Sequence, residues 1–402
     1  MTFAALWHEL EPLGRDPGTG GYRRYSWTQA DAACRAWFTS QAEKRGLAVE
    51  SDNNGNLWAW WGPRAAGAIA TGSHLDSVPA GGGFDGALGV VSALAAVDLL
   101  REKSFSPERT VVLAAFTEEE GARFGVPCLG SRLLTGAIDP DTARALTDDA
   151  GITLAEAMAA AGHDPARIGP DDERLSGISA FVELHVEQGR ALAPMGAAVG
   201  TAEGIWPHGR WRLDFGGRAD HAGTAKFADR RDPMLAYART VLAAWRAAAE
   251  NDALATFGKV TAEPGGSNAV CSAVRAWLDA RAPDEATLEK TVTTVRSVSE
   301  RSSAAHGVTL SVRQESYSPA VHFDAGLRSR IEWVLAARGV PAPALPTGAG
   351  HDAGVLAARL PAAMLFVRNP TGVSHSPAEH AEMADCEAGV RALAAVLEDL
   401  AR

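Results

Sequence analysis

The sequence has few cysteines, no long apolar run and fewer basic than acidic side chains. Its four cysteines, Cys34, Cys128, Cys271 and Cys386, form no CxxC pair, which excludes a zinc ribbon or disulfide scaffold and predicts a cytoplasmic location. No stretch of about 18 apolar residues occurs and the start of the chain lacks a secretory pattern, so we expect neither a membrane span nor a signal peptide. With 38 Lys and Arg against 49 Asp and Glu, the net charge of −11 argues against a nucleic acid or an anionic membrane as partner.

What remains is a globular composition, with 46% hydrophobic and 22% charged residues over 402 positions. Helical and strand patterns alternate up to about residue 208 and again from 323, whereas the block between them has the order β-α-β-β-α-β. We therefore predict an α/β fold with a discontinuous catalytic domain, residues 1–208 and 323–402, in which helices flank a mixed central sheet. Residues 209–322 are predicted to form an inserted small α+β domain that serves as a lid or in dimerisation.

Individual elements follow from the same patterns. Strands are predicted at 47–50, 68–74, 110–117, 181–186, 210–214, 259–262, 273–281, 308–314 and 362–367. Helices are predicted at 27–45, 88–102, 233–250, 285–305, 327–338 and 386–400. Residues 135–178, which are richer in Asp, Gly and Pro, are expected to form a surface excursion with short helical pieces.

Five short segments place histidine and acidic residues at the ends of predicted strands or beside glycines. They are GSHLD at 72–76, GGFDG at 82–86, TEEEG at 117–121, ELHVE at 183–187 and SHSPAE at 374–379. Any one of them alone is more simply explained as a loop histidine or a solvated acidic face. Ligands of open α/β sheets gather where the carboxyl ends of strands meet, so the five together indicate one site.

The chemistry that needs such residues is a pair of divalent cations about 3.5–4 Å apart that hold a hydrolytic water. Imidazoles supply neutral ligands, and carboxylates offset the charge of the cations. The predicted ligands are His74, Asp85, Glu120, His185 and His375. Glu119 is predicted to be the general base, because it neighbours a ligand without being one. Asp76 is placed to orient the imidazole of His74.

The chain resembles the metal-dependent aminoacylase/carboxypeptidase (M20) superfamily, in particular its hydantoinase/carbamoylase branch. The resemblance covers nearly the whole chain, with GSHLDSV, GGGFDGALGV, EEEGARF, FVELHVEQG, ADHAGT, RRDP, GAGHDAG and SHSPAEH in family order. It implies two divalent cations per subunit, Zn²⁺ or Mn²⁺, with Co²⁺ or Ni²⁺ as alternatives. By resemblance, His74 and His185 hold one cation, Glu120 and His375 hold the other, and Asp85 bridges them.

The resemblance also implies a homodimer through the inserted domain. His221 of the partner subunit would polarise the substrate carbonyl, Asn268 and Arg281 would hold a substrate carboxylate, and Gln188 and His351 would lie nearby. Two departures from the family pattern fall in this domain. The sequence Ala225-Lys-Phe227 replaces the family's TPM after HAGT, and the turn after Asn268 reads Ala-Val-Cys271 without the usual proline.

The predicted function is hydrolysis of a linear ureido or carbamoyl C–N bond. A Gly-rich stretch at 14–24 resembles the allantoate amidohydrolases of the branch, so allantoate is the first candidate, ahead of N-carbamoyl-L-amino acids and β-ureidopropionate. GGGFDG at 81–86 also matches a nicotinamide-dinucleotide loop, but seven residues, 75–81, separate it from the end of the predicted strand, so we reject an oxidoreductase. No G-x-S-x-G elbow supports a serine hydrolase. An inactive binding protein is disfavoured because every ligand position is occupied.

Overall fold

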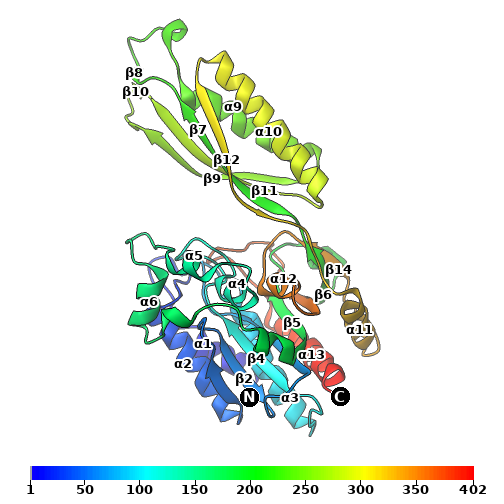
Figure 1. Ribbon diagram of the computed structural model, residues 1–402. Helices are drawn as coiled ribbons and strands as arrows, with labels where there is room; N and C mark the ends of the chain where they lie inside the picture. The colour runs from blue at the N-terminus through cyan, green and yellow to red at the C-terminus, as the bar shows by residue number, and fades with distance from the viewer. Residues whose placement is uncertain (1) are drawn as a thin grey trace. The chain divides into compact units, whose positions relative to one another are not determined.

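The computed structural model describes residues 2–402, which divide into two compact units (Figure 1). Unit 1 contains the chain up to Gly204 and again from His322 to Arg402, and unit 2 is Ile205–Val321. The inserted block predicted from the sequence, 209–322, begins after Ile205, where unit 2 begins. Residues 205–208 show no helix or strand pattern in the sequence, so the prediction starts later. The predicted fold class, α/β with a mixed central sheet flanked by helices, is confirmed. Among residues 2–402, no helix has both the length and the apolar character needed to cross a bilayer.

Unit 1 is built on a sheet of nine strands in which the four central strands run parallel. The order is β1 (Ala48–Ser51), β2 (Leu57–Trp61), β4 (Val111–Phe116), β3 (Ala68–His74), β5 (Ile178–Val186), β15 (Ala362–Val367), β6 (Val199–Ile205) and β13 (Val321–His322), with β14 (Ala344–Thr347) paired to β6. Strands β4, β3, β5 and β15 are parallel, whereas β1, β2 and β6 pair antiparallel with their neighbours. The carboxyl ends of the four parallel strands therefore meet at one edge.

Helices cover both faces of this sheet. One core cluster joins inward-facing residues such as Val182, Leu184 and Leu365 to five helices, namely α1 (Phe3–Leu10), α2 (Gln29–Lys44), α3 (Ala87–Glu102), α11 (Ala325–Ala336) and α13 (Met383–Leu400). The helices α7 (Asp172–Gly177) and α12 (Asp352–Leu356) contact the strands from the other side, and α4 (Leu129–Thr135) packs on both. The remaining short helices are α5 (Pro140–Arg144), α6 (Leu154–Ala160), η1 (Pro165–Arg167) and α8 (Leu192–Met195). Helix α3 is buried almost all round, which explains why its sequence is apolar without a polar face.

Several elements of unit 1 lie outside the predicted ranges, and β2, α1 and β6 show why. Strand β2 is a run of apolar and tryptophan residues with no alternation, because it is buried on both faces. Helix α1 is only eight residues long, and β6 mixes glycine and threonine with apolar residues. Helix α2 begins after Thr28, within the predicted range 27–45, and the Thr28 side chain accepts a hydrogen bond from the Asp31 N–H.

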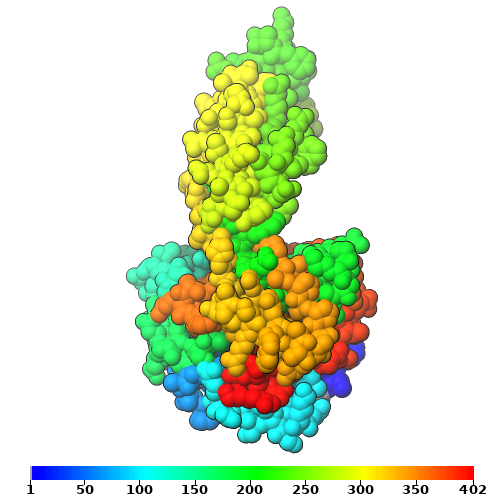
Figure 2. Space-filling model, turned by 90° about the vertical axis from the view of Figure 1, so that its right-hand side faces the viewer, coloured from blue at the N-terminus to red at the C-terminus, as the bar shows by residue number. Residues whose placement is uncertain are grey.

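Unit 2 is a four-stranded antiparallel sheet covered on one face by two helices. The strand order is β12 (Thr309–Ser318), β7 (His208–Gly216), β11 (Ala273–Arg281) and β9 (Leu254–Glu263), and the helices are α9 (Pro233–Glu250) and α10 (Glu285–Ala305). A short ladder of β8 (Asp220–His221) and β10 (Ala269–Val270), with the turn η2 (Phe227–Asp229), completes it. The helical layer, with α10 in yellow, faces the viewer in Figure 2. Along β7, Trp211, Leu213 and Phe215 are buried, and the alternate positions are polar.

Candidate metal centre

The parallel strands bring the five predicted ligands to one edge of the unit 1 sheet. His74 is the last residue of β3 and His185 is the penultimate residue of β5. Glu120 follows β4, His375 follows β15, and Asp85 lies in the loop that precedes α3. All except His375 are largely buried, and Asp85 is 7% exposed. The fold therefore gathers residues from five separate segments into one cluster.

Asp85 lies between two groups of potential cation ligands. Its Oδ1 is 3.5 Å from His74 Nε2 and 3.2 Å from His185 Nε2. Its Oδ2 is 3.3 Å from His375 Nε2, which in turn is 3.4 Å from Glu120 Oε2. The ligand atoms of His74, Asp85 and His185 lie within 4.8 Å of one another, as do those of Asp85, Glu120 and His375. One carboxylate thus belongs to two adjacent ligand sets.

The hydrogen bonds of His74 and His185 fit a divalent cation at the first of these positions. His185 Nδ1 is 2.9 Å from the carbonyl oxygen of Val186, and His74 Nδ1 is 3.1 Å from that of Asp76. A carbonyl oxygen can only accept, so each Nδ1 donates, and a neutral ring then carries its lone pair on Nε2. Both Nε2 atoms face Asp85 Oδ1, and a cation between these acceptors would satisfy them. His185 Nε2 also accepts a hydrogen bond from the Gly86 N–H at 3.2 Å.

The electrostatics of the cluster lead to the same conclusion. Burial alone would raise the pKa of Asp85, but hydrogen bonds to the three imidazoles hold it well below its usual range. The hydrogen bond to Asp85 raises the pKa of His375 to about 9. Burial, and then the charge of Asp85, raises the pKa of Glu120 to about 7. Without a cation the cluster holds protons to offset its buried acids, and a divalent cation would displace them.

Glu119 is placed with its two oxygens in different surroundings. Oε1 accepts a hydrogen bond from the Cys128 thiol at 3.1 Å, and Oε2 is 3.6 Å from His74 Nε2. Burial raises the pKa of Glu119 well above its usual value, although the charge of His74 opposes this. The carboxylate of Asp76 accepts hydrogen bonds from the N–H groups of Glu119 and Glu120, at 3.2 and 3.1 Å. Asp76 therefore orients the acidic turn as well as His74.

Two residues predicted to contact substrate, Gln188 and His351, lie against the cluster. Gln188 donates a hydrogen bond to Asp85 Oδ2 at 2.8 Å, and its Oε1 has no partner. The ring of His351 lies 4.5 Å from that of His185, and its Nε2 is buried without a partner. Burial, and then the charge of His185, lowers the pKa of His351 well below its usual value, so this ring is neutral.

The other three predicted substrate residues lie in unit 2, at opposite ends of its sheet. His221 and Asn268 are exposed neighbours, since the Ala222 N–H donates to the Asn268 carbonyl at 3.0 Å. They belong to the region of β8 and β10, which lies beyond the first residue of β11, Ala273 (Figure 1). Arg281 is the last residue of β11. A strand rises about 3.3 Å per residue, so Arg281 lies roughly 25 Å from Ala273, the first residue of the strand. Within one chain Asn268 and Arg281 are therefore not brought together on one carboxylate.

Two functional candidates were not assigned from the sequence. Glu379 stands in SHSPAEH, but nothing in a linear motif indicates that its carboxylate reaches the loop of Asp85, as it does here. Cys128 precedes a short helix and has no motif that would pair it with Glu119. Both contacts depend on tertiary packing between segments.

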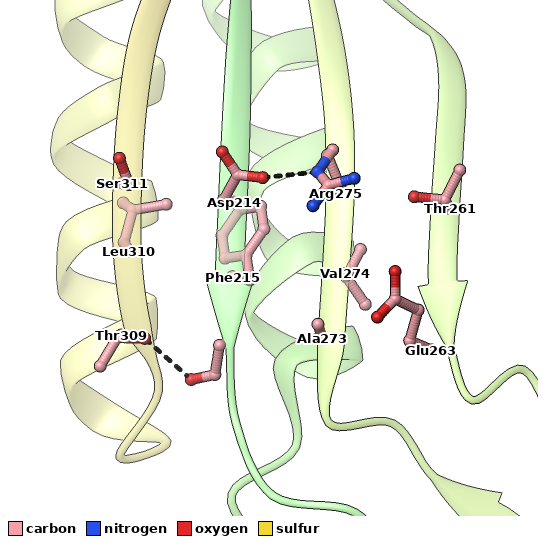
Figure 3. Close-up of a pocket in the computed structure, with 11 residues that line it drawn as sticks. Asp214, Phe215, Thr261, Glu263, Ala273, Val274, Arg275, Thr309, Leu310 and Ser311 are labelled. Carbon is pink, nitrogen blue, oxygen red and sulfur yellow. Dashed lines mark hydrogen bonds and ion pairs between the residues drawn. The ribbon is translucent and has the colours of Figure 1, made fainter.

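Unit 2 also contains a hollow of about 270 Å³ on its sheet, shown in Figure 3. Two of the charges that line it are paired, because Asp214 accepts a hydrogen bond from Arg275 at 2.8 Å, and Glu263 is the other charged residue of the lining. None of the predicted site residues lines it. We therefore assign the chemistry to the strand ends of unit 1.

An α/β sheet with adjoining cation-ligand groups at its parallel strand ends is an arrangement typical of metal-dependent hydrolases. The model of peptidase family M20/M25/M40 matches residues 70–399, and the chain belongs to this family. The predictions of the M20 family and of a hydrolase that acts on C–N bonds are confirmed.

Relatives from this family match over almost the whole chain. An N-carbamoyl-L-amino acid amidohydrolase of Geobacillus stearothermophilus is 34% identical over 96% of this chain and 96% of its own length. An allantoate amidohydrolase of Bacillus subtilis is 31% identical over 95% of this chain and 93% of its own. The crystal structure of a hydantoinase/carbamoylase family amidase from Burkholderia vietnamiensis matches with a TM-score of 0.89 and 29% identity, covering 99% of this chain and 96% of that one.

A methyl group added at Gly86 should disturb the cluster. Gly86 has φ +66°, and a Cβ there would lie 2.3 Å from the His74 ring. We expect Gly86→Ala to weaken divalent-metal binding by about 10- to 100-fold, because His74 must move, as measured by chelator competition. The matched control is Gly125→Ala, which also has positive φ (+78°) but nothing within 4 Å. Equal metal affinity in both variants and the wild type would contradict the placement of His74.

Proposed function

We propose that the chain is a dinuclear-metal amidohydrolase that cleaves the C–N bond of a linear ureido or carbamoyl group in a substrate bearing a carboxylate. The observation that carries this proposal is the position of Asp85 between two ligand groups, each containing at least one imidazole. A single bridging carboxylate of this kind is what two cations about 3.5–4 Å apart require.

In this proposal His74 and His185 hold one cation, Glu120 and His375 hold the other, and Asp85 touches both. Three imidazoles with two carboxylates suit Zn²⁺ or Mn²⁺, and also accept Co²⁺ or Ni²⁺. When bound, the cations lower the pKa of a water molecule and polarise the scissile carbonyl.

Glu119 moves the proton. Its Oε2 faces the cluster while the Cys128 thiol occupies Oε1, so one oxygen is free to accept a proton from the attacking water. The same oxygen then returns the proton to the leaving nitrogen. For a carbamoyl group, one water is consumed and the products are the free amine, ammonia and carbon dioxide.

Residues of unit 2 bind and polarise the substrate in this scheme. The Gly223 N–H donates to Nδ1 of His221 at 3.0 Å, so the neutral ring carries its proton on Nε2 and can donate it to an oxyanion. Arg281 carries a guanidinium suited to a carboxylate. Asp279 accepts hydrogen bonds from its Nε at 2.8 Å and its Nη2 at 3.2 Å, which fixes the plane of the group. Asn268 supplies an amide beside His221, and Gln188 and His351 complete the contacts from unit 1.

Allantoate is the first substrate we propose, followed by N-carbamoyl-L-amino acids and β-ureidopropionate. Residues 14–24 favour allantoate by resemblance, but Arg24 is buried there and donates to the carbonyls of Leu10 and Leu13. This stretch also pairs Tyr22 with Gly81, so it supports the loop that carries Asp85. The named relatives act on both of the first two substrate classes, and the choice between these substrates therefore belongs to a direct assay.

A homodimer through unit 2 follows from the same residues. If His221 and Arg281 contact one substrate, they must come from different copies of the chain, because they lie at opposite ends of one sheet. Helix α9 offers a surface for a second copy, with Leu235, Leu242 and Trp245 exposed by 44, 56 and 66%. Together with the exposed Ala238 and Ala249, they repeat at intervals of three and four residues, which is the spacing of a helix–helix seam.

A cytoplasmic location is also proposed. All four cysteines are unpaired, and three of them, Cys34, Cys128 and Cys386, are buried. Free buried thiols of this kind suit a reducing compartment.

The role of Glu119 is tested by Glu119→Gln. The amide keeps the shape of the side chain but cannot take a proton, so we expect turnover to fall by about 10²- to 10⁴-fold with unchanged metal content. Glu118→Gln is the matched control, because the Glu118 carboxylate accepts hydrogen bonds from the Arg123 and Phe124 N–H groups instead. A metal-replete, active Glu119→Gln variant would rule out Glu119 as the base.

The substrate class is tested by measuring ammonia release from allantoate, an N-carbamoyl-L-amino acid and β-ureidopropionate side by side, with a dipeptide as the control. We expect turnover of at least one ureido or carbamoyl substrate and none of the dipeptide. Cleavage of the dipeptide alone would overturn the proposed reaction. Among active substrates, Arg281→Ala should raise KM most for the substrate whose carboxylate Arg281 holds. Arg281→Lys should restore KM poorly, because lysine lacks the planar fork of arginine.

The dimer is tested on helix α9. Leu242→Glu with Trp245→Glu places charges in the proposed seam, so we expect a monomer by light scattering and loss of turnover with metal retained. Thr293→Glu, at an exposed polar position of α10, is the control and should stay dimeric and active. An active monomer in the double variant would contradict the sharing of His221 between subunits.

A further inference from the structure

Glu379 is a buried acid to which the proposed mechanism gives no role. It is 6% exposed and lies in the loop after β15, four positions beyond His375. Its Oε1 accepts hydrogen bonds from the N–H groups of Phe84 and Asp85, at 2.9 Å each. Its Oε2 accepts one from the Ser374 hydroxyl at 3.1 Å. The carboxylate thus joins the loop of Asp85 to the loop of His375.

The surrounding chain is shaped to admit this carboxylate. A Cβ at Gly82 would lie 2.3 Å from Glu379 Oε1 and 2.4 Å from its Cβ, so a residue larger than glycine would push the two loops apart. The Ser374 hydroxyl, held by Glu379, is also 3.3 Å from Gln188 Nε2 and 3.5 Å from Asp85 Oδ2. Both the main chain and the side chain of Asp85 are therefore fixed from the His375 side of the cluster.

We propose that Glu379 is a positioning residue that sets the distance between Asp85 and His375 and so fixes the spacing of the two cation positions. The inference rests on the proposed dinuclear function. Asp85 has to present one oxygen to each ligand group, and its main-chain N–H is the part of the residue that anchors this orientation. Glu379 supplies the anchor through an oxygen that accepts two N–H groups at once. The geometry of this acceptor, rather than its charge, is what the site needs.

Three substitutions at Glu379 separate geometry from charge. Glu379→Gln keeps an oxygen at the same reach and loses the charge, so metal affinity should stay within about threefold of the wild type. Glu379→Asp keeps the charge but is shorter by one methylene, and Glu379→Ala removes the acceptor. We expect both to weaken metal binding about 10- to 100-fold, the usual effect of losing a group that orients metal ligands.

The measurements are metal content after dialysis, Zn²⁺ affinity by chelator competition and the melting temperature of the metal-free protein. Gly82→Ala is a second test that leaves Glu379 intact, and it should weaken Zn²⁺ binding in the same way. The proposal would be overturned if Glu379→Asp bound Zn²⁺ like the wild type and Glu379→Gln bound it as weakly as Glu379→Ala. It would also be overturned if the variants had a lower melting temperature but unchanged Zn²⁺ affinity. If the wild-type protein itself holds no divalent metal, the dinuclear function fails, which is a distinct result.

Discussion

Burial of negative charge at the strand ends of unit 1 is the constraint around which this molecule is organised. Asp76, Asp85, Glu119 and Glu120 share one largely enclosed patch, and carboxylates taken out of water require compensating positive charge or protons. In the metal-free protein this burial raises the pKa values of Glu119 and Glu120. Two divalent cations would compensate this buried negative charge. The same acids that destabilise the metal-free fold would therefore favour metal binding.

In the proposed function the two units contribute different parts of the chemistry. Unit 1 holds the rigid cluster, in which each imidazole is fixed by a main-chain carbonyl or a carboxylate. Unit 2 presents donors on exposed strand ends and turns, where side chains have no such support. Under that proposal the substrate preference of this chain would depend chiefly on unit 2, and the departures at Ala225–Phe227 and at Cys271 both fall in that unit.

Much of the site could be predicted from the sequence because its ligands follow strands directly. His74, His185 and the Glu119–Glu120 pair come at the ends of apolar runs, and parallel strands end at one edge. Contacts made across distant loops could not be predicted in this way. The bonds of Glu379 to the Asp85 loop and of Cys128 to Glu119 leave no periodic trace, since each depends on how two irregular segments pack.

The same reasoning explains the errors in the fold. Strand β2 lacks alternation because both of its faces are buried, and the eight residues of α1 are too few for a clear helical period. Arg281 and Asn268 lie apart because the strand predicted at 273–281 stands between them, so their separation could be read from the sequence.

The hydrogen bond between the Asp85 N–H and Glu379 joins residues 294 positions apart. During synthesis the first four ligand-bearing segments emerge long before the segment that locks Asp85 in place. In the proposed function, a nascent chain would then have His74, Asp85, Glu120 and His185 but not His375 or Glu379, and tight metal binding would need β15 and the loop after it to dock. Under that proposal, tight metal binding would report that these two distant segments have docked.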